Sequence, residues 1–257
     1  MKGVWGKLST ESFPQGINQG FIEACPGGAV PGSLQAKRRE ELVEKAVVIF
    51  DLDGTLVDSS SDIAWAANRV LERFGHGVLD EEKIKECIGW GVRPLFESLM
   101  KGESAGTIER ARLEFLDIYG GRLLVDTALY PGVTATLDAM AEAGKRMAVV
   151  TNKPAALTAR IVEGLDLSRF FPLVLGGDSL PNKKPHPEPI LKVLDTFGAA
   201  AREAVFVGDS AVDCRAARAA GTAFIGAAYG FRGRRELEEA GCDAVIDTFP
   251  RFLSIVR

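Results

Sequence analysis

The chain has 257 residues and a mass of 27.6 kDa, which suffices for one large domain or two small ones. Its composition, 46% hydrophobic and 26% charged, is typical of a globular protein. The net charge of −4 argues against a nucleic-acid-binding protein, which would carry a basic surface. No apolar run approaches the roughly 18–20 residues of a membrane span. The four cysteines are scattered without a C-x-x-C pair, which excludes a disulfide scaffold and favours a reducing cytoplasm.

Residues 1–45 differ from the rest of the chain. Eight prolines and glycines fall between positions 14 and 32 and break any long periodic pattern. A signal peptide would need a continuous apolar stretch, and a transit peptide would need early arginines, whereas the first arginine here is Arg38. Ser33 could cap a short helix over 34–45. We expect a flexible N-terminal extension, or a stretch that does not belong to the native protein, and the alternative is an extension that binds a partner.

From residue 46 onward, short apolar runs alternate with segments of helical periodicity. The runs are 47–50, 147–150, 173–175, 204–207, 223–225 and 244–246. Each run is continuous in its apolar character, as expected for strands that are buried on both faces of a parallel sheet. The alternation predicts an α/β fold with a doubly wound, mainly parallel sheet and a Rossmann-like core.

Residues 60–128 interrupt this alternation, because they contain helical patterns and no convincing strand. Apolar residues from Ile63 to Phe74 recur at helical spacing, and Gly75 follows as a C-terminal stop. Asp80 can cap a second helix, and further helical patterns cover 95–100 and 108–118. The sequence therefore predicts a helical insert at 59–129 within a core formed by 46–58 and 130–257.

The first apolar run is followed directly by Asp51 and Asp53. Residues two apart in an extended segment point the same way, so these carboxylates can converge on one site. Two close carboxylates repel each other, which favours a bound cation or a shared proton, and hard oxygen ligands suit Mg²⁺. The alternative is a polar turn after a strand.

Polar residues follow the later runs as well. Thr151 and Asn152 could bind an anion at a helix start or simply cap the helix. Lys184 lies in a proline-stiffened loop and is either aimed at a phosphate or a solvated charge. Asp209 and Asp213 lie one helical turn apart and are either metal ligands or acids that favour a helix N-terminus.

In an open α/β sheet, ligands bind beyond the carboxyl ends of the strands. All of these polar residues should therefore lie along one edge of the sheet. Together they would supply metal ligands, anion donors and a cation around a single spot.

With these motifs in order, the sequence resembles the haloacid-dehalogenase superfamily of phosphohydrolases over residues 46–250. The motifs are D-L-D-G-T-L-V-D-S at 51–59, V-V-T-N at 149–152, K-P at 184–185 and G-D-S-x-x-D at 208–213. More narrowly, the phrases at 130–133, 150–154, 176–180 and 184–187 are similar to those of phosphoglycolate phosphatases. The helical insert then resembles the small cap of that superfamily.

The resemblance implies a role for each matching residue. Asp51 would attack phosphorus and form an aspartyl-phosphate, while Asp53 would protonate the leaving group and then deprotonate the hydrolytic water. Mg²⁺ would be held by Asp51, the backbone carbonyl of Asp53 and Asp209, with Asp213 orienting its waters. The phosphoryl oxygens would be bound by Thr151, Asn152 and Lys184.

The residues at positions 52 and 53 distinguish a phosphatase from other enzymes of the superfamily. A dehalogenase would not need it, since a halide leaves unaided, and a transport ATPase would carry lysine where Leu52 stands. We therefore expect a Mg²⁺-dependent phosphatase for a small phosphomonoester, foremost 2-phosphoglycolate. The alternatives are a phosphatase for another small ester such as a sugar phosphate, a β-type phosphohexose mutase, and an inactive binding module.

The part of the cap that closes over the substrate should decide its identity. Glycolate carries a carboxylate, so the cap should offer a cation, and Arg93 is the candidate. The alternative for Arg93 is a solvated helix charge. We expect the partner to be a small phosphate ester, with no nucleic acid or membrane, and the protein to be a cytoplasmic monomer or homodimer.

Overall fold

The computed structural model describes residues 45–256, so the helix expected over 34–45 and nearly all of the N-terminal extension lie outside it. Six strands form one parallel sheet in the order β5-β4-β1-β6-β7-β8. Their bounds are β1 Val47–Phe50, β4 Arg146–Val150, β5 Leu173–Leu175, β6 Ala204–Gly208, β7 Ala223–Ala227 and β8 Ala244–Ile246. Each strand coincides with one of the predicted apolar runs, and the predicted fold class is confirmed.

The centre of the sheet is buried on both faces, which explains the continuous apolar runs. In β1, Val48 and Phe50 belong to one hydrophobic cluster, and Val47 and Ile49 belong to the other. All four side chains are fully buried. A strand buried on both faces has no polar alternation to display.

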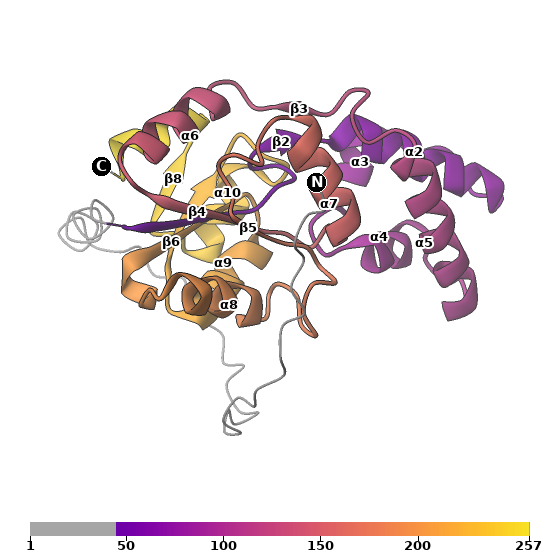
Figure 1. Cartoon of the computed structure of the whole chain (residues 1–257). Helices are drawn as coiled ribbons and strands as arrows, with labels where there is room; N and C mark the ends of the chain where they lie inside the picture. The colour runs from indigo at the N-terminus through magenta and orange to yellow at the C-terminus, as the bar shows by residue number, and fades with distance from the viewer. Residues whose placement is uncertain (1–44, 257) are drawn as a thin grey trace, which may run out of the picture.

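Helices cover the two faces separately. The face of Val48 and Phe50 packs against α6 (Val133–Glu142), α7 (Ala155–Gly164) and the short 3-10 helix η2 (Phe249–Ser254). The opposite face packs against α8 (Glu188–Phe197), α9 (Ala211–Ala220) and α10 (Gly233–Ala240). A second 3-10 turn, η1 (Ala201–Glu203), leads into β6. Figure 1 shows α6 and α8 on opposite sides of the sheet.

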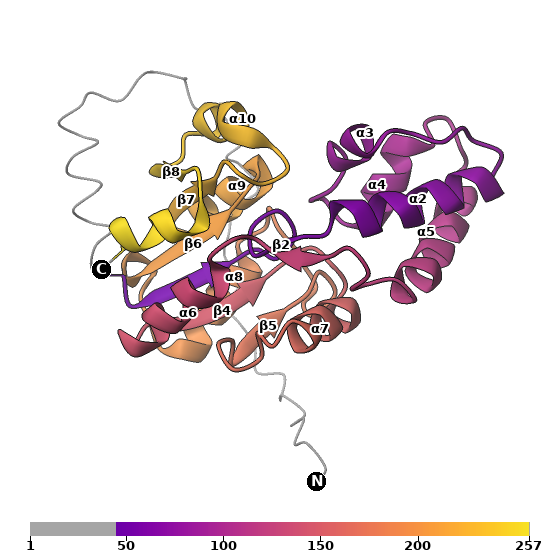
Figure 2. The same ribbon diagram turned by 90° about the horizontal axis from the view of Figure 1, so that it is seen from above.

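The predicted helical insert lies between β1 and β4 and stands to one side of the sheet (Figure 2). Its helices are α2 (Ser60–Arg73), α3 (Glu81–Lys85), α4 (Val92–Leu99) and α5 (Ala105–Gly120). None of the helices within residues 45–256 is long and apolar enough to cross a membrane. The limits 59–129 for the insert remain a prediction.

Two very short strands link the insert to the sheet, and the sequence did not predict them. They are β2 (Val57–Asp58) and β3 (Ala128–Leu129), which pair antiparallel. A two-residue strand is too short to show any periodicity. This pair brings both connections of the insert together beside the carboxyl end of β1.

Aromatic packing organises the interior of the insert. The Phe96 and Phe115 rings meet edge to face at a centroid distance of 5.5 Å, and Phe115 stacks on Tyr119 at 5.2 Å. All three rings are buried. Such pairs have preferred geometries, so they help to fix α5 against α4 inside the insert.

Candidate active site

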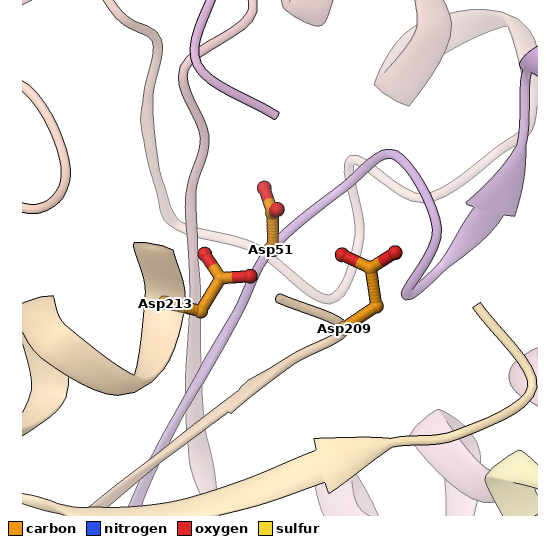
Figure 3. Close-up of side chains that lie close together, drawn as sticks. All are labelled: Asp51, Asp209 and Asp213. Carbon is orange, nitrogen blue, oxygen red and sulfur yellow. The ribbon is translucent and has the colours of Figure 1, made fainter. Parts of the chain in front are cut away.

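Three buried aspartates converge at the carboxyl edge of the sheet. Asp51 directly follows β1, Asp209 directly follows β6, and Asp213 lies in the first turn of α9. One carboxylate oxygen of each lies within 4.8 Å of the others. Figure 3 shows the three side chains reaching toward one another from three separate segments. Because β1 and β6 are parallel neighbours, their ends bring Asp51 and Asp209 together, as predicted.

Lys184 lies between two of these carboxylates. Its Nζ is 2.8 Å from Asp51 Oδ1 and 2.7 Å from Asp213 Oδ1, and the residue is 1% exposed. Burial alone would lower the pKa of Lys184, but Asp213 and Asp51 outweigh it and raise the pKa. The sequence allowed two interpretations of Lys184, and this buried position rules out a solvated charge.

The carboxylate cluster carries more negative charge than Lys184 can balance. Burial raises the pKa of Asp51 to about 6, Lys184 opposes this shift, and Asp213 adds to it. Burial also raises the pKa of Asp209 well above its usual value, and Asp213 and Asp51 add to that rise. Three buried carboxylates beside one ammonium suit a hard divalent cation with oxygen ligands.

Backbone and side-chain contacts orient these carboxylates. Phe231 N donates to Asp209 Oδ2 at 2.7 Å, and Ser210 Oγ donates to Asp213 Oδ2 at 2.6 Å. Gly54 has a φ of +76°, and a Cβ at this position would lie 2.2 Å from Asp209 Oδ2. Only glycine therefore allows the loop after β1 to come this close to Asp209.

Asp53 lines the same site but faces a different cation. Lys153 Nζ lies 2.8 Å and 3.0 Å from its two carboxylate oxygens, and Ser59 Oγ donates to Oδ1 at 2.5 Å. Burial would lower the pKa of Lys153, but Asp53 outweighs it and raises the pKa. Sequence reasoning did not single out Lys153, although its place directly after Thr151 and Asn152 in a strand-end loop was a usable signal.

A cavity with about 600 Å³ of empty space, part of it open to solvent, lies above these residues. Its floor is polar and consists of Asp51, Asp53, Thr151, Asn152, Lys153 and Asp209. Its roof comes from the insert and is almost entirely apolar, with Ile63, Ile88, Val92, Leu95, Phe115 and Tyr119. The structure thus brings most of the predicted site residues to one cavity.

Asn152 is engaged differently from the prediction of a free anion donor. Its Nδ2 donates to the carbonyls of Gly89 and Lys184, each at 2.9 Å. Its Oδ1 is buried and has no hydrogen-bond partner within residues 45–256. Asn152 therefore ties the floor of the cavity both to the lysine loop and to the insert.

Two further core side chains hold the same part of the insert, which we call the insert loop (residues 86–91). Lys183 Nζ donates to the Trp90 carbonyl at 2.8 Å, and the Arg232 guanidinium donates to two more carbonyls of the loop. Together with Asn152, they fasten the insert loop beside the cavity from three different core loops. Sequence reasoning missed this set because backbone carbonyls leave no mark in a sequence.

Arg93 was expected to bind the substrate carboxylate, but its side chain does not reach the site. Its side chain is 45% exposed, and its Nε lies 2.9 Å from Glu97 Oε1. A second contact at 3.5 Å joins Arg93 to Glu109. The cavity lining within the described chain does not include it.

With this geometry established, comparison with known proteins identifies the family. The family model described as "Haloacid dehalogenase-like hydrolase" matches residues 48–227. This protein is a haloacid dehalogenase-like hydrolase. The predicted family is confirmed.

Curated relatives of this hydrolase are named phosphoglycolate phosphatase. One from Nitrosospira multiformis is 40% identical, covering 83% of this chain and 96% of its own. Another from Colwellia psychrerythraea is 36% identical over 83% of this chain and 97% of its own. A crystal structure from Haemophilus somnus, described as a predicted phosphoglycolate phosphatase, has a TM-score of 0.77 at 32% identity. It covers 83% of this chain and 99% of its own.

Proposed function

We propose that this hydrolase is a Mg²⁺-dependent phosphatase that converts 2-phosphoglycolate to glycolate and phosphate. The observation that carries the choice of substrate is the apolar roof of the cavity. Above the floor, the roof offers one polar side-chain atom, the Tyr119 hydroxyl. The several hydroxyls of a sugar would lose their water there without gaining partners. A two-carbon leaving group brings no hydroxyls to the roof, and its one carboxylate can pair with Lys153 on the polar floor. The names of the relatives point the same way.

Asp51 is the nucleophile in this proposal. Both Lys184 Nζ and Leu52 N are bound to its Oδ1, the latter at 2.7 Å, so Oδ2 is the oxygen left to attack. Oδ2 forms a bond to phosphorus while the bond from phosphorus to the glycolate oxygen breaks. The product is an aspartyl-phosphate on residue 51.

Asp53 moves the proton in both half-reactions. It donates a proton to the leaving glycolate oxygen, and it then takes a proton from the water that attacks the aspartyl-phosphate. Ser59 and Lys153 hold its carboxylate at the cavity floor.

The charge of the phosphoryl group needs balancing as the bonds change. We assign Lys184 and Thr151 to the phosphoryl oxygens, with Asn152 linking this position to the insert loop. Asp51, Asp209 and the Asp53 carbonyl would hold Mg²⁺, with Asp213 near its waters, and the ion would neutralise phosphoryl charge when bound.

A substrate panel with free-phosphate detection tests the proposal. In Mg²⁺, we expect the highest kcat/KM for 2-phosphoglycolate, ahead of glucose 6-phosphate, ribose 5-phosphate and β-glucose 1-phosphate. EDTA should abolish turnover, and excess Ca²⁺ should inhibit it because its coordination is larger and looser. A preference for a sugar phosphate would overturn the substrate assignment. Conversion of β-glucose 1-phosphate to the 6-phosphate without phosphate release would indicate a mutase.

A further inference from the structure

The Tyr119 hydroxyl is a buried polar group that the proposed chemistry does not use. Tyr119 is 1% exposed and lies in the last turn of α5, where it lines the cavity. Its hydroxyl makes no hydrogen bond of strict geometry within residues 45–256, and the neighbouring Lys153 ammonium is the group that interacts with it. A buried hydroxyl with spare hydrogen-bonding capacity, on a residue that lines a cavity, is a candidate contact for a ligand.

The packing of the ring keeps this hydroxyl in place. Tyr119 stacks on Phe115 at a centroid distance of 5.2 Å, and Phe115 is in turn held by Phe96. These ring contacts and the burial of the residue hold the Tyr119 ring in one position. The direction of the hydroxyl is set by the fold before any ligand arrives.

Lys153 lies beside Tyr119. Its Nζ is 4.7 Å from the centroid of the Tyr119 ring. Among the residues that line the cavity in the described chain, Lys153 is the only cation. Asp53 accepts hydrogen bonds from Lys153 through both carboxylate oxygens, and an ammonium has three protons to donate.

The Tyr119 hydroxyl is neutral at physiological pH, so it has a proton to donate to an anion. Burial raises the pKa of Tyr119 to about 12, and the neighbouring Lys153 opposes the shift without reversing it. A neutral hydroxyl beside an ammonium provides two adjacent donors, which is the arrangement that a carboxylate binds.

We propose that Tyr119 and Lys153 form the subsite that binds the carboxylate of the leaving group. The inference rests on the proposed function, because Tyr119 and Lys153 would bind the glycolate part of the proposed substrate. In 2-phosphoglycolate, one methylene carbon separates the ester oxygen from the carboxylate carbon. A substrate whose ester oxygen faces Asp53 must therefore place its carboxylate beside the partner of Asp53, which is Lys153.

Lys153 also solves an electrostatic problem in this arrangement. The substrate carboxylate would otherwise lie close to the Asp53 carboxylate, and like charges in a dry site repel strongly. The ammonium between them is attracted to both. Ethyl phosphate has no carboxylate, so it gains nothing from this subsite, and the enzyme discriminates against it.

The test compares 2-phosphoglycolate with ethyl phosphate, which has the same two-carbon chain but no carboxylate. Tyr119→Phe keeps the aromatic packing and removes only the hydroxyl. We expect kcat/KM for 2-phosphoglycolate to fall by about tenfold or more, the scale of one hydrogen bond to a charged group. For ethyl phosphate, kcat/KM should change by less than about twofold, so the selectivity ratio collapses.

Tyr130→Phe is the matched control. Tyr130 lies outside the cavity lining, where its ring packs edge to face on Tyr229 at 4.8 Å. Removal of the Tyr130 hydroxyl should leave the ratio of kcat/KM for 2-phosphoglycolate to kcat/KM for ethyl phosphate unchanged. Melting temperatures of both variants show whether they fold as the wild type does.

Each outcome decides between the claims. An unchanged ratio in Tyr119→Phe, or an equal loss on both substrates, would overturn the subsite while leaving the proposed function intact. If the wild type itself shows no preference for 2-phosphoglycolate over ethyl phosphate, the proposed function fails, and the subsite fails with it.

Discussion

Lys184 Nζ lies 2.8 Å from Asp51 Oδ1, and the same nitrogen lies 2.7 Å from Asp213 Oδ1. Asp213 is itself held by Ser210, whose hydroxyl donates to the other carboxylate oxygen at 2.6 Å. The first turn of α9 therefore sets the position of Lys184, and Lys184 sets the position of Asp51. A loop lysine in this protein acts as the connection between two segments of the core.

The variant Lys184→Met tests this connection. It keeps most of the side-chain volume and removes the charge, so kcat/KM should fall by about 10²-fold or more. Stability should fall by about 3–5 kcal/mol, because Asp51 and Asp213 lose their buried partner. Kinetics and thermal melting measure both effects. Lys192→Met, which removes an exposed lysine paired with Asp195 on α8, is the control and should behave as wild type. Wild-type turnover in Lys184→Met would contradict the account.

Sequence patterns were sufficient to predict the strands and the acidic residues of the site. The six apolar runs became six strands because strands buried on both faces need continuous apolar residues. Asp51, Asp209 and Asp213 could be predicted to converge because parallel strands end at a common edge. The residue types and the topology together determine this part of the site.

The upper half of the site could not be predicted in the same way. Tyr119 reaches the cavity from a helix of the insert, and nothing in its local sequence distinguishes it from an ordinary core tyrosine. Arg93 has the positive charge that could bind a carboxylate, but its side chain pairs with Glu97. The orientation of the insert against the core depends on contacts to backbone carbonyls, which leave no periodic signal.

Arg93→Met is expected to change kcat/KM for 2-phosphoglycolate by less than about twofold, since exposed ion pairs contribute little. The physical reason is that Arg93 is engaged by two glutamates on the surface of the insert. Steady-state kinetics on 2-phosphoglycolate and ethyl phosphate provide the check. If kcat/KM fell for 2-phosphoglycolate but not for ethyl phosphate, Arg93 rather than Tyr119 would bind the substrate carboxylate.

Arg232→Met should loosen the insert loop. It removes charged hydrogen bonds to two carbonyls of residues 86–91, so we expect kcat/KM to fall by about tenfold. Amide hydrogen exchange over this loop should accelerate, while exchange in β1 and β6 stays slow. Arg234→Met is the matched control, because Arg234 pairs with Glu238 and Asp247. Equal exchange in wild type and Arg232→Met would show that the contact does not hold the loop.

Stability should depend on pH and Mg²⁺ together. In the metal-free protein the pKa of Asp51 is about 6 against an ordinary value of 3.8, so the folded state binds this proton more tightly than the unfolded state. The free energy of unfolding should therefore rise as the pH falls from about 6 to about 3.8. Above about pH 6, the folded state bears the full cost of keeping Asp51 ionised. Mg²⁺ removes the penalty, because it competes with the proton for the same carboxylates.

We therefore expect Mg²⁺ to raise the melting temperature more at pH 7.5 than at pH 5. Differential scanning calorimetry with and without EDTA measures the difference. Asp209→Asn, which removes one carboxylate of the cluster, should lose most of the Mg²⁺ effect at pH 7.5. A Mg²⁺ effect that is the same at both pH values would argue against binding at these aspartates.

We propose that Asp51 carries the phosphoryl group and that Asp53 moves the protons. p-Nitrophenyl phosphate separates the two roles, because its leaving group needs little protonation. With this ester, Asp53→Asn should release a burst of p-nitrophenol and then stall, whereas Asp51→Asn should release none.

Trapping of phosphate on residue 51 of Asp53→Asn by acid quench and mass spectrometry is the most direct measurement. We expect a phosphorylated peptide that contains residue 51 in Asp53→Asn, and we expect no such peptide in Asp51→Asn. Substantial turnover by Asp51→Asn, together with an inactive Asp53→Asn that shows neither burst nor trapped phosphate, would contradict it.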